Sequence, residues 1–208
     1  MPSTSAIDHR ALFEDVLAVV RTAQGATAGW RTICVRTQRK VGKEIIRPLS
    51  ELDLDGEVTA LAANVRRLVV GAPADVETLV FGLFDLIDVD PNAGETGGRT
   101  PWEGSDPKRV FTGFHITGLA TFDPSLRWLP RDASWCPDHR FLTSPALDAI
   151  AKAAASHREV SHALAVALRF GAAALLGRFA AEGLPHRVLV SFDEGDFAEI
   201  CAPSRTPA

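Results

Sequence analysis

The chain has 208 residues, of which 46% are hydrophobic and 23% charged, with 16 glycines and 13 prolines, and these proportions exclude collagen-like, disordered and disulfide-scaffold classes. Lys and Arg together number 22 and Asp and Glu 26, so the formal net charge is −4 and a global nucleic-acid footprint is not expected. The chain has no tyrosine, which excludes any mechanism that needs a phenol as acid, base or nucleophile.

The cysteines and the apolar segments indicate the cellular compartment in which we expect the protein. The chain has three cysteines, too few and too scattered for a disulfide framework: Cys34, Cys136 and Cys201. No basic segment followed by an apolar core opens the sequence, and the most apolar stretch, 160–181, is interrupted by Arg169 and Arg178. We therefore expect a cytoplasmic protein with no membrane partner.

Two amphipathic helices are predicted in the first third of the chain. Apolar residues recur at helical spacing over 12–23, up to Gly25, and again over 58–68, where Asp53 or Asp55 can cap the start. Acidic residues crowd the beginning of the second helix, at Glu51, Asp53, Asp55 and Glu57. Because a helix N-terminus favours negative charge, a stabilising role explains these carboxylates without a metal ion.

A strand is predicted between these two helices. Over 30–37 apolar and polar side chains alternate, which is typical of a half-buried strand, and we interpret Cys34 as a small core residue within it. Gly42 suggests a hairpin turn into a second strand over 44–47. The segment 31–47 holds six basic residues against one glutamate, so it forms a local basic patch that the net charge conceals.

Two further strands are predicted in the middle of the chain, over 77–89 and 110–122. We expect them to pair antiparallel across the long Gly- and Pro-rich loop 90–109, which is either a binding loop or a solvated one. Asp85 shares a face of the first strand with apolar side chains, and we interpret it as marking the place where the strand leaves the core.

The last third of the chain alternates irregular and regular segments. Residues 123–143 are irregular but rich in aromatic side chains, so we expect them to pack on the body of the protein. A short helix over 144–155 and the longest helix over 156–182 follow, and 187–201 forms a closing hairpin. The order of elements predicts a single α+β domain, with helices packed on an antiparallel sheet of about five or six strands. Residues 202–208 are expected to be a frayed tail.

One pair of residues has the spacing of metal ligands. Cys136 and His139 form a Cys-x-x-His pattern, which is half of a zinc site. The other half is missing, because His157 and His162 are five residues apart and diverge around a helix. We therefore expect no metal ion and no cofactor.

The same part of the chain allows a small hydrolase-like enzyme as an alternative. Its cleft would be formed by the 90–109 loop and the 123–140 segment. Its candidate catalytic residues are His115, Asp123, Cys136 and His139. No Gly-x-Ser-x-Gly motif supports this reading, so catalysis is not the main expectation.

Three segments carry a resemblance. They are Phe114-His115-Ile116-Thr117-Gly118-Leu119 with Phe122-Asp123-Pro124, then Trp135-Cys136-Pro137-Asp138, then a helix that leads into the Val-Leu-Val-Ser-Phe-Asp-Glu-Gly-Asp-Phe hairpin. Together, over roughly 79–200, they resemble small cytosolic α+β proteins among the bacterial polymorphic-toxin immunity proteins. The resemblance implies tight binding to a cognate toxin, with no transferable catalytic residues.

We therefore expect a protein partner, and specifically a basic toxin. Carboxylates at strand ends would steer a basic enzyme toward the chain, and exposed tryptophans would anchor it in place of tyrosine. The expected partner-binding residues are Asp85, Asp88, Asp90, Trp102, Trp128, Trp135, Asp193, Glu194 and Asp196. A stable homodimer through the same tryptophans remains an alternative.

Overall fold

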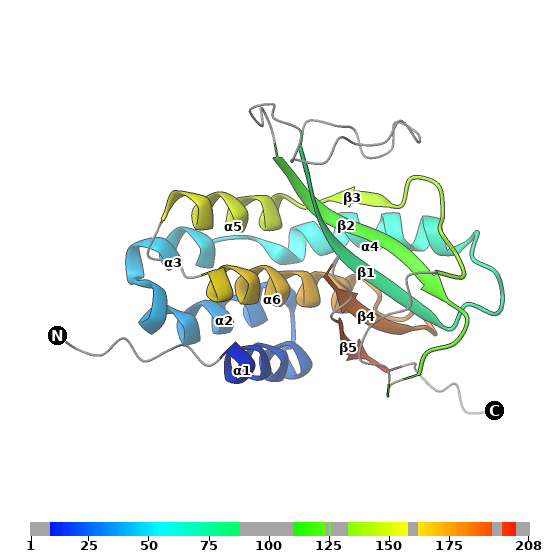
Figure 1. Ribbon diagram of the computed structural model, residues 1–208, viewed down its shortest axis with the longest axis horizontal. Helices are drawn as coiled ribbons and strands as arrows, with labels where there is room; N and C mark the ends of the chain where they lie inside the picture. The colour runs from blue at the N-terminus through cyan, green and yellow to red at the C-terminus, as the bar shows by residue number, and fades with distance from the viewer. Residues whose placement is uncertain are drawn as a thin grey trace.

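The computed structural model describes residues 9–87, 110–123, 125, 133–157, 162–192 and 197–202 (Figure 1). The helices are α1 (His9–Thr22), α2 (Ala26–Val41), α3 (Lys43–Ser50), α4 (Leu54–Val69), α5 (Pro145–Ser156) and α6 (His162–Ala180). The strands are β1 (Thr78–Ile87), β2 (Val110–Leu119), β3 (Phe141–Thr143), β4 (Arg187–Ser191) and β5 (Phe197–Cys201). The α+β class predicted from the sequence is confirmed.

The predicted strand over 30–37 is wrong, because this segment lies inside helix α2. Trp30, Ile33 and Thr37 follow one another at helical spacing and are all buried, whereas Val35 is 67% exposed. The strand prediction rested on every second residue sharing a face, and it therefore placed Ile33 and Val35 on the same face. In the helix they point to different sides. Cys34 is fully buried, as expected of a small core residue.

The predicted hairpin at Gly42 is also wrong, because two helices meet there. Gly42 has φ +101°, a left-handed conformation that ends α2, and its N–H donates to the carbonyl of Gln38. The short helix α3 follows and buries Ile45, Ile46 and Leu49. A glycine of this kind is found both between two helices and in a β-hairpin. The buried face of α3 shows that here it joins two helices.

The sheet has five strands in the order β3-β2-β1-β4-β5. The antiparallel pairing of β1 with β2 is confirmed, and β4 and β5 form the expected antiparallel hairpin. However, β1 and β4 run parallel, so the sheet is mixed and the prediction of a purely antiparallel sheet is wrong. The chain passes through α5 and α6 before β4, and a helical crossover of this kind allows a parallel neighbour.

Helix α6 lies at the centre of the core. It is the one described helix long and apolar enough to cross a membrane, with a mean hydropathy of 1.5, but 72% of that window is buried inside the protein. Helices α1, α2, α4 and α5 all pack on it. The sequence predicted one packed face, and the structure buries this helix almost all round.

The two faces of the sheet have different surroundings. Leu79, Phe81 and Phe114 point into the large core that the helices share. Val80, Leu119 and Leu189 point to the other side, where they form a small cluster with the half-buried Phe122 and Phe197. No residue of a described helix belongs to this second cluster. We call this side the helix-free face, and Figure 1 shows β1 and β2 crossing in front of α4.

Candidate functional site

The structure describes few of the expected partner-binding residues. Asp85 lies in β1 opposite Thr112, but the position of its side chain is not among those described. The other expected acidic and tryptophan positions lie outside the described residues, namely Asp88, Asp90, Trp102, Trp128, Asp193, Glu194 and Asp196.

Trp135 corrects one expectation, because it is not an exposed anchor. It is 9% exposed and forms an isolated antiparallel bridge with Gly118 of β2. A Cβ atom at position 118 would lie 2.9 Å from Cε3 of Trp135, so the glycine makes room for the indole. Trp135 therefore fastens the irregular segment after β2 to the sheet, as the aromatic content of that segment predicted.

His115 lies on the helix-free face, in β2 opposite Gly82 of β1. A Cβ atom at position 82 would lie 2.0 Å from Cε1 of His115, so the imidazole occupies the space that a side chain would otherwise fill. The ring of Phe141 lies 6.2 Å away between centroids. Burial lowers the pKa of His115, and the nearby Arg140 guanidinium lowers it further, so the imidazole is held neutral.

Cys136 and His139 lie in a turn beside the same strand. The turn begins at Trp135, which bridges Gly118, and ends at Arg140, whose carbonyl accepts a hydrogen bond of 2.9 Å from the Ile116 N–H. Both side chains are exposed, and His139 has a positive φ of 55°. Within the described residues, no group of three or more His, Cys, Asp or Glu could hold a metal ion.

Asp123 is the fourth of the candidate catalytic residues, and its carboxylate is hydrogen-bonded to a neighbour in the sequence. It follows the end of β2, is exposed, and accepts hydrogen bonds from the Ser125 N–H at 2.8 Å and the Ser125 hydroxyl at 2.7 Å. These hydrogen bonds lower the pKa of Asp123. Backbone hydrogen bonds of Trp135 and Arg140 thus hold the turn with Cys136 and His139 against β2, the strand of His115, but no described hydrogen bond joins the three side chains.

Aromatic rings and arginines gather in two clusters on the helix-free face. In the Phe122 cluster, Phe122 lies 5.4 Å from Phe197, and the Arg187 guanidinium lies 4.9 Å above the Phe122 ring. Nε of Arg187 also lies 3.1 Å from a carboxylate oxygen of Glu199 in β5, which makes an ion pair across the two strands.

The Phe141 cluster lies at the other side of the sheet and includes Phe141, the first residue of the edge strand β3. Phe84 lies 5.4 Å from Phe141 in an edge-to-face arrangement, and Arg140 lies 4.8 Å above the Phe141 ring. Phe141 and Arg140 are only partly buried, as are the rings and the arginine of the Phe122 cluster. Sequence reasoning missed both clusters, because their members come from strands whose order it did not fix.

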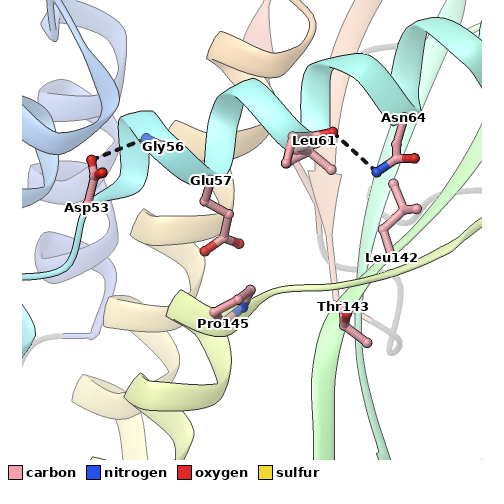
Figure 2. A pocket seen from close by; sticks show the side chains of 9 residues that line it. Asp53, Gly56, Glu57, Leu61, Asn64, Leu142, Thr143 and Pro145 are labelled. Carbon is pink, nitrogen blue, oxygen red and sulfur yellow. Dashed lines mark hydrogen bonds between the residues drawn. The ribbon is translucent and has the colours of Figure 1, made fainter.

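A cavity of about 400 Å³ lies between α4 and the start of α5 (Figure 2). The residues that line it are Asp53, Gly56, Glu57, Ala60, Leu61, Asn64, Leu142, Thr143 and Pro145. Figure 2 shows Glu57 pointing from α4 toward Pro145. Burial raises the pKa of Glu57, and hydrogen bonds from Ser144 and Ala146 offset part of that rise.

The carboxylates of this region stabilise the starts of three helices. Asp53 caps α4 by accepting from the Gly56 N–H at 3.2 Å. Asp55 accepts from the first N–H groups of α2, those of Ala26 at 2.9 Å and Thr27 at 3.2 Å. Glu57 accepts from the Ser144 hydroxyl and, at 3.0 Å, from the Ala146 N–H at the start of α5.

Asp53, Asp55 and Glu57 therefore lie at helix starts, whereas Glu51 faces Arg47, and the sequence did not show which helices these carboxylates serve. Only Asp53 caps its own helix, whereas Asp55 and Glu57 cap helices that begin elsewhere in the chain. The raised pKa of Glu57 comes from its burial between α4 and the start of α5.

A second cavity of about 560 Å³ lies where the end of α4 meets the starts of β1 and β4. Its walls combine apolar and polar surface in similar measure, and Glu77, Thr78, His186 and Arg187 are the polar residues that line it. Burial lowers the pKa of His186.

Comparisons with models of protein families, with curated proteins and with solved structures found no match for this chain.

Proposed function

We propose that the protein is a binding protein of the immunity type, which neutralises a cognate toxin by direct contact. The observation that carries this proposal is the pair of arginine–phenylalanine clusters on the helix-free face. Arginine and aromatic side chains dominate the binding energy of protein interfaces, and this chain has no tyrosine to serve as an anchor.

The partial burial of these side chains suits residues that anchor a partner. The rings of Phe122 and Phe141 are partly buried against the sheet, so little rotamer entropy is lost when a partner covers them. An arginine above an aromatic ring is attracted by about 0.5–1 kcal/mol in water and by about 2 kcal/mol once desolvated. A partner that covers Arg140 and Arg187 would therefore strengthen contacts that already exist.

The choice of a basic toxin rests on the sequence. The carboxylates proposed to steer it are Asp85 in β1 and those that follow β1 and β4 in the sequence, at 88–90 and 193–196. Steering by such groups raises the association rate, whereas the aromatic clusters would hold the complex.

The proposal can be tested with the full chain and one pair of variants. The tagged protein is purified from its host, a stoichiometric partner is identified, and the purified pair is titrated by calorimetry. We expect Arg140→Glu to weaken binding at least about tenfold, because truncating or reversing an interface anchor costs on the order of 2 kcal/mol. Arg66→Glu on the exposed side of α4 is the control and should leave the affinity unchanged.

The biological readout is protection of cells that express the captured partner. Protection by the wild type and by the Arg66→Glu variant, with loss of protection in Arg140→Glu, supports the proposal. Equal affinity of wild type and Arg140→Glu for the partner contradicts it, and so does a partner that is harmless to cells.

One observation favours the enzyme as a second candidate. The neutral imidazole of His115 lies on β2, and the turn that holds Cys136 and His139 is fastened to the next residues of that strand. A neutral imidazole can accept a proton from a nucleophile. An activity lost in both His115→Gln and Cys136→Ser, with folding intact, would favour this candidate over the binding protein.

A further inference from the structure

The solvent face of α2 is strongly basic. The helix holds Arg31, Arg36, Arg39 and Lys40, all exposed, and no acidic residue. Four of the six basic residues of the segment 31–47 thus lie on α2, and the other two, Lys43 and Arg47, lie on α3. This basic face stands out in a chain whose net charge is −4.

An apolar side chain lies in the middle of this basic face. Val35 is 67% exposed, which only Val70 exceeds among the large hydrophobic residues that the structure describes. Residues four apart share one side of a helix, so Arg31, Val35 and Arg39 form a single row about 12 Å long. We call this row the α2 ridge.

The charges of the α2 ridge are not used within the described fold. No carboxylate of the described residues lies within 4.0 Å of Arg31 or Arg39. On the neighbouring helix α3, Arg47 is 3.8 Å from its own Glu51. The helix dipole accounts for a cation at Arg39 in the last turn, but it does not account for Arg31.

We infer that the α2 ridge binds an acidic segment of another protein, with carboxylates that meet Arg31 and Arg39 on either side of an apolar side chain that covers Val35. A central apolar contact flanked by arginines is the composition of a protein interface. Nucleic-acid backbones offer phosphates but no apolar partner for Val35, and the net charge of the chain opposes them.

This surface is distinct from the one proposed for the toxin. Helix α2 packs on α1, α3, α4 and α6, whereas the aromatic clusters lie on the helix-free face of the sheet. Each surface can therefore fail its test without affecting the other.

The test uses two labelled 16-residue helical peptides of equal negative charge. In one, glutamates flank a central stripe of leucines, and in the other glutamines replace the leucines. Fluorescence anisotropy measures their binding to the full-length protein. We expect the leucine peptide to bind several-fold more tightly, because it alone can cover Val35.

Variants then identify the residues. Arg31→Gln combined with Arg39→Gln should weaken binding of the leucine peptide about tenfold, because the double variant removes both ion pairs with the peptide. Arg66→Gln combined with Arg67→Gln changes the net charge equally on exposed positions of α4 and should change binding less than about twofold. Val35→Asp should abolish the preference for leucine while the thermal unfolding curve stays unchanged.

Three outcomes would overturn the inference. The first is equal weakening in the two double variants, which would show non-specific attraction. The second is tighter binding of a 16-base-pair DNA duplex than of the leucine peptide. The third is a wild-type dimer in sedimentation that the Arg31 and Arg39 substitutions dissociate, since the ridge would then join two copies of this chain.

Discussion

Glu57 offers the sharpest check on how the helices are held together. The carboxylate joins α4 to the start of α5 by accepting from the Ser144 hydroxyl and from the Ala146 N–H. Replacing Glu57 by alanine leaves both donors without this partner. At about 1 kcal/mol for each hydrogen bond, the free energy of unfolding should fall by about 2 kcal/mol. In a chain of this size, that corresponds to a melting temperature about 4–8 °C lower.

The effect should depend on pH in a defined direction. The pKa of Glu57 in the folded protein is raised above its ordinary value of 4.5, mainly by burial. The folded state therefore favours the protonated carboxyl. Its stabilising contribution is full below the unfolded pKa and is partly lost as the pH rises through the folded pKa. The gap in unfolding free energy between wild type and Glu57→Ala should thus be larger near pH 4 than near pH 7.

Urea denaturation followed by circular dichroism at both pH values measures this gap. Glu51→Ala is the matched control, because the Glu51 side chain is 70% exposed and faces only the exposed Arg47, so its loss should cost less than about 0.5 kcal/mol. Ser144→Ala should couple with Glu57→Ala in a double-mutant cycle, since both remove one shared hydrogen bond. A gap that widens from pH 4 to pH 7, or no coupling with Ser144, would refute the reasoning.

Three further outcomes are expected. Asp55→Ala should lower the unfolding free energy by about 1–2 kcal/mol in urea melts, because Asp55 caps α2 from α4, while Asp75→Ala at an exposed turn should not; equal losses would contradict the cap. In an NMR titration the His115 imidazole should titrate below 6.5, and Arg140→Gln should move its pKa upward; an unmoved pKa would show that Arg140 does not act on it. Burial raises the pKa of Cys34 to about 12, so a thiol reagent should modify exposed Cys136 in the native protein and reach Cys34 only on unfolding; rapid native labelling of Cys34 would place it outside the core.

Local sequence patterns determined the elements whose periodicity and end signals agree. The apolar spacing of α1 and α4, an acidic cap for α4 at Asp53 or Asp55, and the Ser144-Pro145 start of α5 each follow from short-range hydrogen bonding and side-chain direction, and the structure selects Asp53 as the cap. The β1–β2 and β4–β5 pairs also follow, because consecutive strands joined by loops favour antiparallel pairing.

Tertiary packing decided what those patterns leave open. Residues 30–37 alternate like a strand, yet they form a helix because α6 offers an apolar partner for Trp30, Ile33 and Cys34 together. The parallel pairing of β1 with β4 and the caps that Asp55 and Glu57 supply to distant helices depend on contacts between segments far apart in the chain. The helix-free face and the α2 ridge have the same origin, because each depends on which of the described helices pack against that part of the fold.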